Sequence, residues 1–269
     1  MLGTLLLWFG WYGFNAGSAI NLENELKPIV VAISTVNTTL SAATAGITAM
    51  MLQLIITERL TGEAVFNLSG AMNGCLTGLA AVTAGCAIIE PWAAVVIGLV
   101  AGVVYVLSSS LIMKWCIDDA VDAIPVHLFG GLWGVISVGL FASPRCLKSF
   151  LGVSEVDHAG LFYEWGRGTS NATLLACQLI GSVFILAWVS VIMFPFFLTL
   201  NYIGWFRADS LEEIVGLDVS YHGWNPNLVD IPQDALDAYD IRRSERLSKH
   251  GFIDNDVGVD KVHWLWMGS

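Results

Sequence analysis

Charged residues are scarce in this 269-residue sequence. Only 13% of the residues are Asp, Glu, Lys or Arg, whereas 55% are hydrophobic and the mean hydropathy is +0.67. Soluble domains typically carry about 25% charged residues, so this composition excludes an ordinary water-soluble domain. A lipid bilayer is therefore the expected solvent.

The sequence also lacks the patterns of two common classes of site. With 12 Lys and Arg against 23 Asp and Glu, the net charge of -11 excludes a basic surface for nucleic acid. The five cysteines contain no Cys-x-x-Cys pair and no metal-ligand spacing. We therefore expect neither a disulfide framework nor a metal site or cofactor.

Six windows of the chain contain no charged residue. They cover residues 1–22, 28–57, 64–89, 91–113, 123–144 and 168–206. Each reaches the roughly 20 residues that an α-helix needs to cross about 30 Å of hydrocarbon, and each is too long for a membrane strand. The first window lacks the basic start of a secretory signal, so we interpret it as a span. The pattern predicts an all-α, polytopic membrane helix bundle with about six transmembrane helices.

Two regions follow from the charge distribution. Residues 1–206 form the predicted transmembrane domain, and residues 207–269 form a soluble tail that carries most of the acidic excess. Lys and Arg near the membrane are almost balanced between the two sides, so the positive-inside rule gives no clear orientation. Beyond about residue 224 the tail is polar and mixed in charge, and we expect it to be mostly disordered.

Asn171-Ala-Thr173 is a glycosylation sequon. It adjoins the last predicted helix, where an asparagine also serves as an ordinary helix start. We favour the second interpretation.

Glycines recur at four-residue spacing in three windows, at Gly70, Gly74 and Gly78, at Gly98 and Gly102, and at Gly130 and Gly134. Lipid supplies no hydrophobic drive between helices, so membrane helices associate through small residues that allow close approach. The spacing predicts a compact bundle, as in a channel or transporter.

His127 is the only histidine within a charge-free window. A polar group left unsatisfied in hydrocarbon costs several kcal/mol, so it needs a partner or a function. One interpretation is a structural histidine that bonds a neighbouring helix. The other is a pore-lining imidazole that donates and accepts a proton near neutral pH.

The first window combines aromatic rings with glycines and with the polar residues Asn15 and Ser18. Such rings often form an interfacial belt, but an aromatic face also holds a cation. The polar residues of the third window, Asn73, Thr77 and Thr83, are open to two interpretations in the same way, because they suit either interhelical bonding or a pore lining.

Four segments resemble one family. Trp8-Phe-Gly-Trp-Tyr-Gly-Phe-Asn-Ala-Gly-Ser18 resembles the sixth helix of the ammonium transporter, methylammonium permease and Rhesus superfamily, on its ammonium transporter side. Residues 67–88 resemble the eighth helix, residues 118–127 the start of the tenth, and residues 216–223 the tail after the eleventh. The resemblance covers about residues 2–224 and implies the second half, helices six to eleven, of an eleven-helix fold with inverted repeats.

The resemblance also implies roles for single residues. Phe14 matches the second gating phenylalanine, and Ser18 matches the hydroxyl of the outer ammonium site. His127 matches the second pore histidine. The remaining candidates are Trp11 beside the histidine pair, Asn15, Asn73 and Thr83 toward the pore, and Asp122 in a structural role before His127.

The sequence departs from the family pattern in two respects. Pro125 and Leu128-Phe129 stand where many bacterial members have glycine around the histidine. The family's first five helices, with the other pore histidine, the first gating phenylalanine and the tryptophan of the outer site, have no counterpart in this chain.

The resemblance implies transport of ammonium, ammonia or methylammonium, and not an enzyme. It further implies a homotrimer when the protein is full length, in the plasma membrane, with a cytoplasmic C-terminus. Within the tail, Gly216, Asp218, His222 and Gly223 match a segment that docks on a neighbouring subunit and couples the pores.

Three hypotheses about this chain stay open at this point. It is a portion of a transporter that is inactive alone, a non-conducting or regulatory subunit of a full-length trimer, or a relative of ammonium-sensing receptors whose tail signals to partners.

Overall fold

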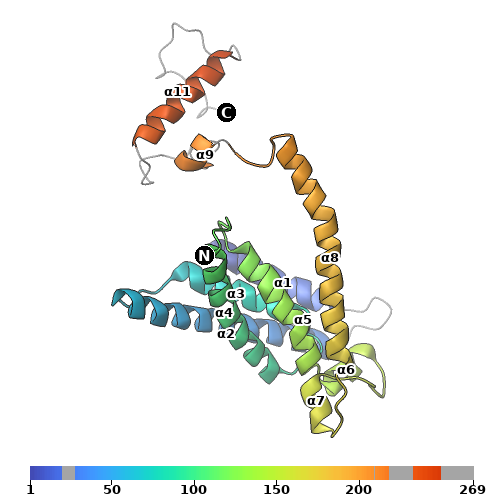
Figure 1. Ribbon diagram of the computed structural model, residues 1–269. Coiled ribbons are helices and arrows are strands. Elements are labelled where there is room, and N and C mark those ends of the chain that lie inside the picture. The colour runs from blue at the N-terminus through green and yellow to red at the C-terminus, as the bar shows by residue number, and fades with distance from the viewer. Residues whose placement is uncertain (20–27, 209, 218–232, 250–269) are drawn as a thin grey trace. The chain divides into compact units, whose positions relative to one another are not determined.

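The computed structural model describes residues 1–19, 28–208, 210–217 and 233–249, and within these residues it contains helices and no strand (Figure 1). The helices are α1 (Leu2–Ser18), α2 (Pro28–Thr61), α3 (Leu68–Thr83), α4 (Pro91–Lys114), the π-helix η1 (Ile124–Phe129), α5 (Gly130–Phe141), α6 (Pro144–Leu151), α7 (Leu161–Gly166), α8 (Thr173–Tyr202), α9 (Ser210–Val215) and α11 (Gln233–Lys249). The chain divides into two units, Met1–Trp188 and Val189–Ser269.

Each charge-free window contains a long helix or helical pair, which confirms the predicted polytopic helix bundle. Four of them are long and apolar enough to cross a membrane: α2 with 34 residues, α4 with 24, η1 with α5 at 18, and α8 with 30. Helices α1 and α3 have 17 and 16 residues. At 1.5 Å per residue they are about 24 to 26 Å long, near the short end of the spanning range.

Helix α2 lies at the centre of the first unit, where it packs against α1, α3 and α4 (Figure 1). A Cβ atom added to Gly78 of α3 would lie 2.5 Å from the carbonyl oxygen of Ser41. A Cβ atom on Gly102 of α4 would lie 2.6 Å from the carbonyl oxygen of Ala45. The glycines therefore let two helices approach the backbone of α2, which confirms the packing predicted from their spacing.

Helix α5 packs on α3 in the same way. A Cβ atom on Gly134 would lie 2.5 Å from the carbonyl oxygen of Ala81, and one on Gly130 would lie 2.9 Å from the methyl group of Thr77. The π-helix η1 precedes α5 directly and contacts α3, α4 and α5. The segment that carries His127 is thus placed by three helices.

Helix α8 is apolar and almost unburied within the described residues. Ser182 is its one buried residue, and large apolar side chains such as Phe184 and Trp188 are exposed on it. Such a surface is stable only against lipid or another protein surface.

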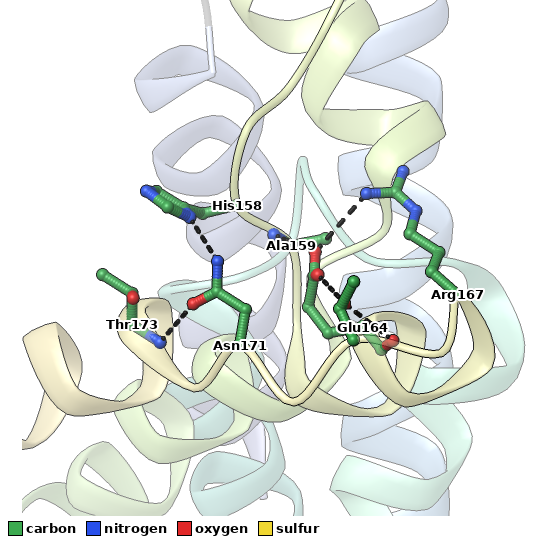
Figure 2. Close-up of polar contacts among 7 residues, drawn as sticks. His158, Ala159, Glu164, Arg167, Asn171 and Thr173 are labelled. Atoms are coloured by element: carbon green, nitrogen blue, oxygen red, sulfur yellow. Dashed lines mark hydrogen bonds and ion pairs between the residues drawn. The ribbon is translucent and has the colours of Figure 1, made fainter.

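Short helices cap the bundle in the connection from α5 to α8. In Figure 2, Asn171 lies between His158 and the start of α8. Its Oδ1 accepts from the backbone N–H of Thr173 at 3.0 Å, and its Nδ2 lies 2.9 Å from Nδ1 of His158. This geometry confirms the interpretation of Asn171 as a helix start.

Glu164 of α7 is the buried carboxylate of this connection (Figure 2). It accepts from the hydroxyl of Thr169 at 2.6 Å and from the backbone N–H of Ala159 at 3.1 Å, and Arg167 lies 3.4 Å away. The bond from Thr169 outweighs the effect of burial and lowers the pKa of Glu164. The carboxylate therefore joins the segments before and after α7, within the connection from α5 to α8.

The tail differs from expectation where it is described. Helix α11 occupies residues 233–249, within the stretch for which the sequence analysis expects disorder. Asp234 lies in the first turn, where a negative charge is favourable, and Gln233 donates to Asp237 at 3.1 Å. Tyr239 is buried, and α11 packs against α9. Helical propensity and this contact explain the difference.

Candidate functional site

Helix α1 is fixed to the bundle through Trp11. Its indole N–H donates to the hydroxyl of Thr83 in α3 at 2.8 Å, and that hydroxyl in turn donates to the carbonyl of Leu79 at 2.7 Å. The structure thus brings together two predicted pore residues. The hydroxyl of Thr83 therefore both accepts and donates a hydrogen bond within the bundle.

Asn15 points into the bundle. It is 1% exposed, and its amide donates to the hydroxyl of Thr38 in α2 at 2.8 Å. Its Oδ1 is buried without a hydrogen-bond partner among the described residues. Asn15 therefore ties α1 to α2, whereas its neighbour Phe14 stays exposed.

Phe14 and Ser18 lie on the outer side of α1. They are four residues apart, so they share one face of the helix, and the ring of Phe14 is 61% exposed. The hydroxyl of Ser18 donates to the carbonyl of Phe14 at 2.7 Å. Because its proton is engaged within the helix, the exposed oxygen keeps its lone pairs available to accept a hydrogen bond.

His127 lies in the π-helix η1 with its side chain exposed. Its ring makes no hydrogen bond within the described part of the chain. Pro125 is buried in the first turn of η1, where its missing N–H is tolerated because first-turn N–H groups have no partner within the helix. π-Helical turns are rare and often occur at functional sites.

Asp122, just before η1, gathers three side chains from two helices. Its carboxylate accepts from the hydroxyl of Tyr105 at 2.8 Å, from the hydroxyl of Ser109 at 3.0 Å and from the amide of Asn73 at 3.4 Å. Asn73 also lies 3.5 Å from the carbonyl of Val121. Asn73, predicted toward the pore, is therefore a partner of Asp122.

The sequence analysis did not identify Tyr105 or Ser109. Both lie in a charge-free window and are buried. The sequence did contain a signal for them, because Tyr105 and Ser109 are four residues apart and therefore share one face of an apolar helix.

The docking segment of the tail is described only in part. Gly216 has a φ of +96°, and its N–H bonds the carbonyl of Glu212 at 2.9 Å, so it ends α9 in a conformation that favours glycine. Asp218, His222 and Gly223 lie outside the described residues.

Comparison with known sequences gives one consistent result. Residues 1–225 match the Ammonium Transporter Family. Ammonium transporter 3 of Dictyostelium discoideum is 36% identical over 230 residues, which cover 85% of this chain and 50% of that protein. Ammonium transporter 1 member 1 of Arabidopsis thaliana is 36% identical over 248 residues, 91% of this chain and 48% of that protein.

Solved structures agree with the sequences. The crystal structure of Saccharomyces cerevisiae Mep2 has a TM-score of 0.64 at 31% identity and covers 77% of this chain and 44% of its own. A sensor Amt protein has a TM-score of 0.63 at 29% identity, with 82% and 48% covered. The chain spans about half the length of the curated relatives that it matches.

Proposed function

Because the chain belongs to the Ammonium Transporter Family, we propose that it supplies the carboxy-terminal half of an ammonium pore. It is an integral, multi-pass membrane protein of a transporter family. In the proposed pathway, Ser18 receives ammonium at the outer mouth, the ion gives up its proton to water there, and neutral ammonia then passes Phe14 and His127.

The observation that carries this proposal is that the polar and aromatic groups of α1 and η1 divide into those bonded to neighbouring helices and those left exposed. Asn15 and the indole N–H of Trp11 bond inward to α2 and α3. Phe14, Ser18 and His127 stay exposed. These three residues therefore suit a lumen that a second half of the bundle closes.

The proposed chemistry separates ammonium from potassium by hydrogen bonding. Ammonium donates N–H bonds, and Ser18 offers an oxygen whose own proton is engaged. An aromatic ring beside it stabilises a cation by about 0.5 to 2 kcal/mol. Beyond the mouth, an ion that enters an apolar lumen loses its hydration water, which costs many kcal/mol. Potassium is therefore excluded, while neutral ammonia passes.

The same proposal places this chain in a larger assembly. The pore of an inverted-repeat transporter lies between its two halves. We expect residues 1–269 alone not to conduct. The working protein would be a homotrimer in the plasma membrane with a cytoplasmic tail, whose segment from Gly216 to Gly223 docks on a neighbouring subunit.

Methylammonium uptake in transporter-deficient cells tests the proposal. The chain is expressed alone and, separately, joined behind the amino-terminal half of Ammonium transporter 3 of Dictyostelium discoideum. Uptake by the joined protein and none by the chain alone is the expected result. Uptake by the chain alone at the rate of a full-length relative would contradict it.

A sensing role is the second candidate, since the fold also matches a sensor Amt protein. A joined protein that reaches the membrane, binds methylammonium and gives no uptake would favour that role.

A further inference from the structure

The carboxylate of Asp122 is the most highly connected polar group next to the proposed pore. Both of its oxygens accept hydroxyl hydrogen bonds from α4, and Asn73 of α3 adds a third donor. Tyr105 is 2% exposed and Ser109 is 7% exposed. The two donors are therefore shielded from water, while Asp122 itself is half-buried, and removing the carboxylate would leave the buried hydroxyls without this acceptor.

The backbone of Asp122 connects this cluster to the helix of His127. Asp122 has a φ of +57°, a left-handed conformation that residues other than glycine, asparagine and aspartate rarely adopt. Its carbonyl accepts from the N–H of Val126 at 3.0 Å, across the first turn of η1. The position of Asp122 therefore sets where this turn begins.

Asp119 holds the same turn in another way. Its carboxylate accepts from the backbone N–H groups of Ala123 at 2.8 Å and Ile124 at 2.7 Å. These bonds satisfy backbone N–H groups at the start of η1, and they involve no neighbouring helix. Asp122 is thus the residue that ties the turn to α3 and α4.

We propose that Asp122 is a positioning residue for His127: its carboxylate, held by Tyr105 and Ser109, fixes the register of the π-helical turn that presents the imidazole to the pore. The inference rests on the proposed function, since it concerns how His127 serves the pore. It assigns the buried residues Tyr105 and Ser109 to the transport site through their bonds to Asp122.

Two substitutions of Asp122 separate the backbone from the side chain. Asp122→Gly keeps the left-handed conformation without strain and removes the carboxylate. Asp122→Asn also tolerates this conformation and keeps one acceptor oxygen, so it removes mainly the charge. If Asp122 served only to make the turn, the glycine variant would behave as the wild type.

A matched pair on α4 tests the donors. Ser109→Ala removes a bond to Asp122. Ser110→Ala removes a hydroxyl that bonds the carbonyl of Val106 in its own helix at 2.9 Å. The two changes are chemically identical and adjacent, but Ser109 is buried and Ser110 is exposed, so Ser110→Ala controls for the loss of a hydroxyl from α4 and not for burial.

The first readout is the imidazole signal of His127 in the purified chain with ¹⁵N-labelled histidine, assigned by comparison with His127→Gln. Asp122→Gly and Ser109→Ala should shift or broaden this signal, Asp122→Asn should shift it less, and Ser110→Ala should leave it in place. An unchanged His127 signal in Asp122→Gly would overturn the proposal.

The second readout is methylammonium uptake by the joined protein. Asp122→Gly should lower uptake about 10-fold or more, because one lost bond to a charged group corresponds to roughly 10- to 150-fold in an equilibrium constant. Ser110→Ala should stay within about 2-fold. If His127→Ala leaves uptake unchanged, the proposed function fails. If His127→Ala abolishes uptake and Asp122→Gly does not affect it, the positioning role fails alone.

Discussion

Two glycines one turn apart on α5, Gly131 and Gly134, differ sharply in their surroundings. A Cβ atom on Gly134 would lie 2.5 Å from the carbonyl oxygen of Ala81 and 3.0 Å from its carbonyl carbon and Cα. These are backbone atoms of α3, so no side chain can rotate away. A Cβ atom on Gly131, one turn earlier, would meet nothing within 4 Å.

The two alanine substitutions should therefore have opposite signs. Overpacking a close contact costs about 1–3 kcal/mol, and alanine gains up to about 1 kcal/mol over glycine within a helix. For Gly134→Ala the clash outweighs the gain, and we expect a net loss of about 1–2 kcal/mol. For Gly131→Ala only the gain applies, so we expect a small stabilisation of up to about 1 kcal/mol.

Thermal unfolding of the purified chain in detergent measures the difference. At about 2–4 °C per kcal/mol for a domain of this size, Gly134→Ala should lower the apparent Tm by several degrees, while Gly131→Ala should hold or raise it. Equal Tm values for Gly134→Ala and the wild type would refute the close approach of α5 to α3.

Two further predictions concern the outer mouth of the proposed pore, at Ser18 and Phe14, and the loop around Glu164 that connects α5 to α8. Ser18→Ala in the joined protein should raise the half-saturating methylammonium concentration by about 10-fold or less, because water can replace part of a lost bond worth about 1.5–3 kcal/mol. Phe14→Ala should change the maximal rate or the leak instead, and identical effects on both parameters would contradict separate roles. Glu164 has a lowered pKa, so its stabilisation of the loop is present in full above the ordinary pKa of 4.5 and is lost as the pH falls from 4.5 through the lowered pKa. Amide exchange in residues 159–171 should be slower in the wild type than in Glu164→Gln at neutral pH, and the difference should disappear as the pH falls below 4.5 and through the lowered pKa of Glu164. Equal exchange at neutral pH would show that the carboxylate has no such role.

The helices were predictable because long stretches of the sequence contain no charged residue. Each window of at least 22 uncharged residues contains a helix or a helical pair, and the glycine spacing marked the faces that meet. Helix ends were less predictable, as α3 ends at Thr83 and the rest of its window forms turns. Composition sets where a helix is stable in lipid, whereas its last turn depends on local hydrogen bonds.

The site was predictable only in its residue types. His127, Phe14 and Ser18 were identified through local motifs, but the partners of Asn73 and Asp122 were not. These partners lie 13 to 49 positions apart in sequence. Such bonds depend on how α3 and α4 pack, which no local pattern of side chains specifies.

The central claim is that His127 lines an ammonium pore to which this chain contributes one half. Radiolabelled methylammonium uptake by the joined protein, with and without His127→Ala, tests it most directly when surface expression and oligomeric state are matched. The account predicts that His127→Ala abolishes uptake or changes its selectivity against potassium. Uptake and selectivity identical to those of the unsubstituted protein would contradict it and leave His127 a structural residue.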